Sequence, residues 1–304
     1  LLVLLGLGTG HLARGVLAGL GRFGGYARYF IGDGVGRLVL VGLLTLFVAD
    51  EVAVYGLAVG GAPFLGVAAA LAGQRRTGRR PSGPAPEDPP AVGRRAELGA
   101  LAPALGALLV ASVSTAVVLN VSPLAVELLA GPAEVDAAGR FLNALLVARV
   151  PLFFFQAVQA SLLPKLSALA ADQQFDEFRR VLGRLLALVG ALGLAAVVAC
   201  ALIGHRVVEI AFGTEFAVDR RDMVLLAASS AVLMVVLCLA QALIAHRCQG
   251  RMALAWLVGL VAFPLVLALG GDLFLRVELA LLATVATTMV VMVVLLARRS
   301  RLLH

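Results

Sequence analysis

The sequence contains few charged residues. Only 14% of its 304 residues are Asp, Glu, Lys or Arg, against about 25% in an average soluble domain. Its mean hydropathy is +1.01, and 61% of the residues are hydrophobic. The length alone would allow two water-soluble domains, but this composition excludes them.

Residues that ligate metals or act as nucleophiles are also scarce. The chain holds three cysteines and four histidines, and none of them has the spacing of a zinc site or a redox motif. No P-loop and no Ser-His-Asp constellation is visible, and the cysteines imply no disulfide framework. The sequence therefore predicts no metal, no cofactor and no enzymatic activity.

The chain does have long apolar runs that are rich in Leu, Ala and Val. Runs of about 18 or more residues are typical of transmembrane helices, whereas the strands of a membrane barrel would alternate apolar and polar residues. We count about nine spans, at residues 1–20, 33–49, 53–72, 98–120, 139–165, 185–204, 223–245, 253–270 and 277–297. The predicted fold is all-α, a polytopic bundle of transmembrane helices.

Arginine and lysine are distributed unevenly over the loops between these spans. Most of them fall on one side of the membrane, including the arginines of RRTGRRPSGPAPEDPPAVGRR at residues 75–95. The positive-inside rule places this stretch and the C-terminus in the cytoplasm, in a multi-pass protein of the cytoplasmic membrane. The net charge of +7 is thereby explained by topology, and no nucleic-acid partner is expected.

The Pro- and Arg-rich stretch also suggests how the chain is organised, because it cannot bury enough apolar surface to fold alone. We predict a three-helix remainder of an N-terminal lobe at 1–72, a cytoplasmic linker at 73–97, and a six-helix C-terminal lobe with its tail at 98–304. The chain opens inside an apolar run, so an N-terminal part with three further helices is expected to be missing. The whole would be a two-lobe, six-plus-six transporter.

Several segments resemble one known superfamily. LLVARVPLFFFQAVQASLLPKLSALAA is followed by FDEFRRVLGRLLALVGALGLAAVVACALIGHRVVEIAFGTEF, and RGVLAGLGRFGGY lies near the N-terminus. These segments resemble the multidrug/oligosaccharidyl-lipid/polysaccharide exporter superfamily, and most of all its polysaccharide-biosynthesis flippases. The resemblance implies two lobes around a cavity that moves lipid-linked saccharides by alternating access. It also implies a substrate with an anionic headgroup and polysaccharide-synthesis machinery as a partner.

Arg149 is the sharpest candidate for a site residue, because it lies near the middle of the 139–165 span. A cation there costs about 2.5–3.5 kcal/mol, so it should face a cavity or a polar partner. Gln156 lies on the same helical face and Gln159 lies near it, while Pro151 favours a kink. Such a face would suit a pyrophosphate headgroup. The alternative is a structural arginine that binds freed carbonyls and a neighbouring helix.

Two further polar pairs lie near the N-terminus. His11 and Arg14 are three residues apart on the first span, which makes them helical neighbours and candidates for the cavity wall. Asp33 and Arg37 form an i,i+4 pair at the predicted start of the second span, where Asp33 is placed to cap the helix. For this second pair we favour the structural role.

The positions of the acidic residues help to distinguish the alternative functions of the protein. A drug or cation antiporter of the same superfamily typically needs an intramembrane carboxylate, and the spans hold almost none, since Asp33 and Glu278 lie near span ends. A membrane scaffold that no longer transports is a third alternative. A further acidic cluster, expected to be solvated, lies between the sixth and seventh spans at Glu209, Glu215, Asp219 and Asp222.

Overall fold

The computed structural model describes residues 2–19, 23–47, 52–76, 91–131 and 136–302. Every regular element in these ranges is a helix, which confirms the all-α prediction. Among the described residues, six helical segments rather than nine are long and apolar enough to cross a membrane. They are 24–46, 102–129, 175–212, 220–245, 249–267 and 273–298.

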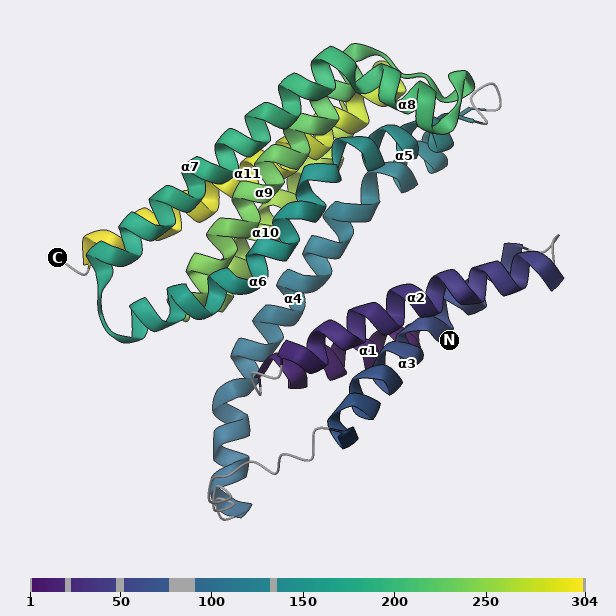
Figure 1. Cartoon of the computed structure of the whole chain (residues 1–304). Coiled ribbons are helices and arrows are strands. Elements are labelled where there is room, and N and C mark those ends of the chain that lie inside the picture. The colour runs from purple at the N-terminus through teal and green to yellow at the C-terminus, as the bar shows by residue number, and fades with distance from the viewer. Residues whose placement is uncertain (1, 20–22, 48–51, 77–90, 132–135, 303–304) are drawn as a thin grey trace. The chain divides into compact units, whose positions relative to one another are not determined.

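The chain forms two compact units, residues 1–88 and 89–304. The first unit contains α1 (Leu2–Gly19), α2 (Phe23–Phe47) and α3 (Val52–Arg76), drawn in purple and blue in Figure 1. Both α1 and α2 pack against α3. The α2–α3 contact is close because Gly66 has no side chain, and a Cβ there would lie 2.9 Å from the Tyr29 carbonyl oxygen.

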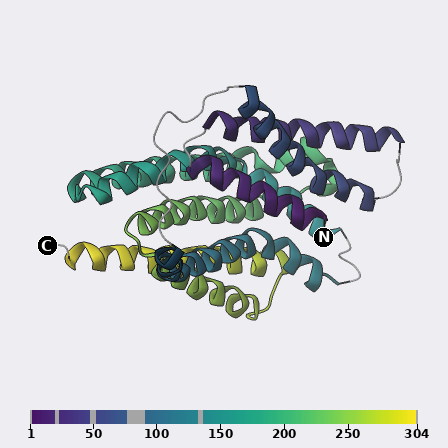
Figure 2. The same ribbon diagram turned by 90° about the horizontal axis from the view of Figure 1, so that it is seen from below.

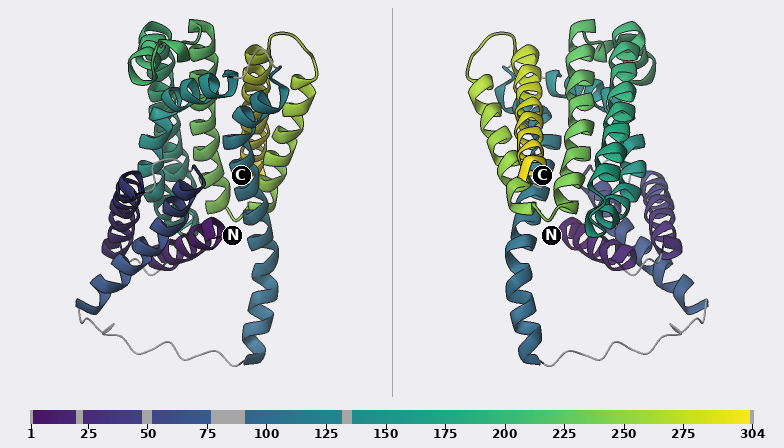
Figure 3. Two further views of the ribbon diagram at one scale, coloured as in Figure 1. Left: turned by 90° about the vertical axis from the view of Figure 1, so that its right-hand side faces the viewer. Right: turned by 90° about the vertical axis from the view of Figure 1, so that its left-hand side faces the viewer.

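The second unit is a bundle whose helices lie side by side along much of their lengths (Figures 2 and 3). A π-helical turn, Cys200–Gly204, joins α7 to α8 within one continuous helical segment, and a short 3-10 turn precedes α9. The helices of the unit are α4 (Ala91–Leu129), α5 (Ala137–Ala148), α6 (Val150–Ala171), α7 (Phe175–Ala199), α8 (His205–Phe212), α9 (Arg220–Ala245), α10 (Gln249–Leu267) and α11 (Leu273–Leu302).

Helix α9 lies at the centre of this bundle. It contacts α5, α6, α7 and α11, while α10 packs between α4 and α11. Of the residues in the most apolar stretch of α9, 61% are buried, against 33% or fewer in any other membrane-length helix. The peripheral helices instead expose apolar side chains such as Leu128, Leu188 and Leu265. An apolar surface of this kind is suited to contact with lipid rather than water.

The predicted span at 139–165 is broken into two helices. Helix α5 ends at Ala148 and α6 begins at Val150, with Arg149 between them at φ −95° and ψ −3°. Pro151 lies in the first turn of α6, where its missing N–H removes no helical hydrogen bond. The break therefore lies where Pro151 predicted a kink.

A close contact between α10 and α11 is made at Gly259. A Cβ at Gly259 would collide with the Thr288 hydroxyl and lie 2.9 Å from the Thr284 carbonyl oxygen. Thr288 donates its hydroxyl to that same carbonyl at 2.9 Å, so its side chain is held in place. Residue 259 therefore has no room for a side chain.

We expect Gly259→Ala to destabilise the full chain by about 1–3 kcal/mol, the usual cost of overpacking. The measurement is thermal unfolding of the detergent-solubilised protein. Gly250→Ala is the matched control, because Gly250 lies in the first turn of the same helix and a Cβ there would meet nothing within 4 Å. Equal losses in both variants would contradict the close contact.

Candidate functional site

The predicted site residues belong to both units, and we describe each unit separately. Arg149 is half-buried at the α5–α6 break in the second unit. Gln156 and Gln159 lie on α6, but their side chains are outside the described residues, so their shared face with Arg149 stays a prediction. His11 and Arg14 lie on α1 of the first unit.

Arg149 bridges two helical segments of the second unit. Its Nη1 donates to the Leu119 carbonyl oxygen of α4 at 2.7 Å. Leu119 lies four residues before Pro123, which is inside α4. Proline has no N–H, so the Leu119 carbonyl lacks its normal helical donor. Because a bilayer offers no water to replace that donor, the Arg149 guanidinium takes its place.

The structural role foreseen as the alternative for Arg149 is therefore present in the molecule. A guanidinium carries five N–H donors in a planar fork, and the bond to Leu119 uses one of them. A cation with further donors, at a helix break inside an apolar bundle, also suits the binding of an anionic headgroup. The same side chain can serve both purposes.

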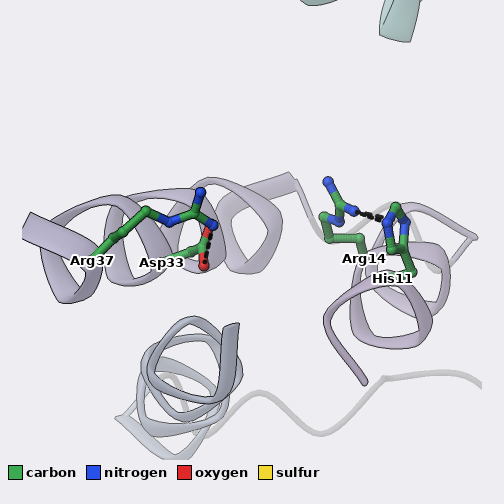
Figure 4. Close-up of polar contacts among 4 residues, drawn as sticks. All are labelled: His11, Arg14, Asp33 and Arg37. Carbon is green, nitrogen blue, oxygen red and sulfur yellow. Dashed lines mark hydrogen bonds and ion pairs between the residues drawn. The ribbon is translucent and has the colours of Figure 1, made fainter. Parts of the chain in front are cut away.

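His11 and Arg14 are neighbours, as their spacing predicted. Arg14 Nη2 lies 2.7 Å from His11 Nδ1 (Figure 4). The guanidinium carbon of Arg14 lies 5.6 Å from the centre of the Tyr29 ring and 5.4 Å from that of Phe30. Cation–π contacts of this kind tie α1 to α2. His11 is exposed and Arg14 is half-buried, so the pair lies at the surface of the first unit.

The second N-terminal pair is also formed, but not at a helix start. Arg37 Nη2 lies 3.2 Å from Asp33 Oδ2 (Figure 4). Because α2 already begins at Phe23, Asp33 lies inside the helix, and the expected capping role is wrong. Arg28 and the glycines before Asp33 interrupt the apolar run in the sequence, but they do not interrupt the helix.

An ion-pair chain connects α9 to the start of α11. Arg221 Nε donates to Asp222 Oδ1 at 3.0 Å, and Arg221 Nη2 lies 3.3 Å from Asp272 Oδ1. Asp272 also caps α11, since it accepts the backbone N–H of Leu275 at 2.9 Å. Asp222 is only 4% exposed, so the expectation that its acidic cluster is solvated is wrong for this residue.

Glu278 is the second buried acid, and it lies near the start of its helix, as the sequence indicated. Its side chain is 0% exposed in the second turn of α11, and neither carboxylate oxygen has a hydrogen-bond partner among the described residues. The sequence placed it near the end of a span and gave it no weight. A usable signal was present, because Phe274, Leu281 and Leu282 surround Glu278 on the helix surface.

No family model matches the chain, and no curated protein or solved structure matches it. Its class is decided by the structure, in which six described helices have the length and apolar composition of membrane spans. The chain is a multi-pass membrane protein. Within the described ranges of this membrane protein, no group of three or more His, Cys, Asp or Glu side chains could hold a metal ion.

Proposed function

We propose that this membrane protein transports lipid-linked saccharides, the precursors of polysaccharides, across the cytoplasmic membrane by alternating access. The observation that supports the proposal is Arg149, a half-buried cation at a helix break with donors beyond its bond to Leu119. In a medium of low dielectric constant, such a group attracts a phosphate or diphosphate strongly. The headgroup would bind there while the lipid tail stays in the bilayer.

The proposal includes the nine-span topology with a cytoplasmic linker and C-terminus. Besides the six membrane-length helices, α1, α3 and the pair α5–α6 would each cross the membrane, with α5 and α6 acting as one broken span. Broken helices are a recurrent way for transporters to form substrate sites near the middle of the bilayer. The first unit would belong to an N-terminal lobe, and polysaccharide-synthesis proteins would supply the substrate.

Arg149→Lys tests this function in the full chain reconstituted into liposomes. The assay follows a fluorescent prenyl-diphosphate saccharide from one leaflet to the other. Wild-type protein should move it, and Arg149→Lys should move it at least about tenfold more slowly, a difference of about 1.4 kcal/mol. Lysine keeps the charge and a donor for the Leu119 carbonyl but loses the planar fork.

Arg220→Lys is the control for this experiment, because Arg220 is exposed at the start of α9. It should transport at the wild-type rate. Folded wild-type protein that moves no lipid-linked saccharide would refute the function. Wild-type transport by Arg149→Lys would refute the role of the guanidinium.

A drug or cation antiporter is the second candidate, and the burial of Glu278 favours it. An intramembrane carboxylate is what cation coupling requires. If liposomes with the protein exchange cationic drugs for protons but do not move the lipid-linked saccharide, the antiporter replaces the first proposal. If the liposomes show neither activity, the remaining alternative is a membrane scaffold that does not transport.

A further inference from the structure

The side chain of Glu278 is buried in the second unit without any donor. It is 0% exposed, and both of its oxygens lack hydrogen bonds within the described ranges. An ionised carboxylate without partners in an apolar interior costs more free energy than the usual stability of a folded domain. Its negative charge must therefore be neutralised, and the described side chains donate nothing to it.

Few charged groups face Glu278 from the helices packed around it, which are α4, α9 and α10. From residue 102 onward, the only titratable residue of α4 is the exposed Glu127. The only one on α10 is Arg251, at the opposite end of that helix. The charged groups that act on Glu278 are Asp222 and Arg221 of α9 and Asp272 at the start of α11.

We propose that Glu278 is a proton-binding site, located where α9 and α11 meet near their N-terminal ends. The carboxylate takes one proton from water and becomes a neutral carboxylic acid, and release to water reverses this step. The neighbouring carboxylate of Asp222 disfavours a second negative charge. Arg221 offers Glu278 little compensation, because its guanidinium is already bound by Asp222 and Asp272.

A proton fits this site better than a metal ion. Metal cations such as Ca²⁺ or Mg²⁺ need about six or more oxygen ligands, and no cluster of three or more ligating side chains occurs in the part of the chain that the structure describes. The nearby hydroxyl of Thr284, less than two turns further along α11, already donates to the Ala280 carbonyl oxygen at 2.7 Å. A proton needs only the carboxylate itself.

The ion-pair chain runs from the surface to a buried carboxylate on α9, a helix that packs against α11. Side-chain exposure decreases along it, from 58% at Asp272 and 47% at Arg221 to 6% at Asp222, and Glu278 is fully buried. Protonation of Glu278 would remove the free-energy cost of burying its charge where α9 and α11 pack together.

If this membrane protein is a transporter, the proton on Glu278 would couple transport to a proton gradient. That coupling rests on the proposed function, whereas proton binding itself does not. The test is therefore a direct measurement of the protonated carboxyl group. It uses infrared spectroscopy on the full chain in liposomes, titrated with acid and base.

We expect the C=O stretch of a protonated carboxylic acid to persist at neutral pH in the wild-type protein and to be absent in Glu278→Gln. Asp222→Asn should also show the band. As the pH is raised, the band should disappear at a lower pH in this variant than in wild type. This variant removes the negative charge beside Glu278 and releases Arg221 to stabilise the carboxylate. It also provides a test if Glu278→Gln does not fold.

Absence of the band in wild type at neutral pH, or its persistence in folded Glu278→Gln, would overturn the proposal. Loss of the band at an unchanged or higher pH in Asp222→Asn would overturn it as well. The outcome is separable from the proposed function. A confirmed band in a protein that moves no saccharide would refute only transport, and saccharide transport without the band would refute only the proton site.

Discussion

Arg149→Leu is expected to destabilise the full chain by about 2 kcal/mol, and Pro123→Ala in the same chain should remove most of that loss. Leucine leaves the Leu119 carbonyl, which Pro123 deprives of its helical donor, without any partner. A buried polar group without a partner costs about 1–3 kcal/mol. Alanine at 123 restores the backbone N–H, which can then donate to that carbonyl.

The measurement is a double-mutant cycle from the unfolding of all four proteins in detergent. An interaction energy of about 1–2 kcal/mol between the two positions is expected. Arg220→Leu, at an exposed position, should show no interaction with Pro123→Ala. Additive effects of Arg149→Leu and Pro123→Ala would mean that the guanidinium does not replace the helical donor.

Phe141→Ala should cost still more, about 3–5 kcal/mol. Phe141 is 0% exposed on α5, and its ring meets that of Phe274 on α11 nearly edge-on, with centres 5.4 Å apart at 77°. Removal of the ring leaves a cavity in the core of the second unit and forfeits the aromatic contact with Phe274. The expected result is a large loss of thermal stability in detergent.

Phe154→Ala is the control for Phe141→Ala, because the ring of Phe154 on α6 is 71% exposed. It removes the same number of atoms from a surface position, so its stability should stay close to that of wild type. A small loss at Phe141, no larger than that at Phe154, would show that the Phe141 ring is not tightly packed in this core.

The sequence predicted the helices of the second unit best where a continuous apolar run ends in a polar loop. The predicted span at 223–245 corresponds to α9, Arg220–Ala245, and that at 277–297 lies within α11, Leu273–Leu302. The prediction failed where charge or glycine interrupts a run, because a helix in lipid keeps its backbone bonds regardless of the side chain. Helix α2 accordingly begins well before the predicted residue 33.

Single residues of the candidate site could be found from the sequence, but their partners could not. Arg149 was identified because a cation inside a span is costly, whereas its partner is a backbone carbonyl that any residue at position 119 would supply. Asp222 was expected to be solvated because it belongs to an acidic cluster in a short loop, and Glu278 was given no weight because it lies near a span end. Their burial depends on how α9 and α11 pack together, and local sequence does not encode that contact.

The bond between Arg149 and Leu119 also has an evolutionary consequence. A relative of this membrane protein that has lost the proline at position 123 regains the amide donor in α4, and selection for a cation at 149 weakens. Conversely, a proline gained at 123 exposes the carbonyl of residue 119 and favours arginine at 149. Positions 123 and 149 should therefore change together across related sequences, while the residue at 119 drifts freely among apolar types.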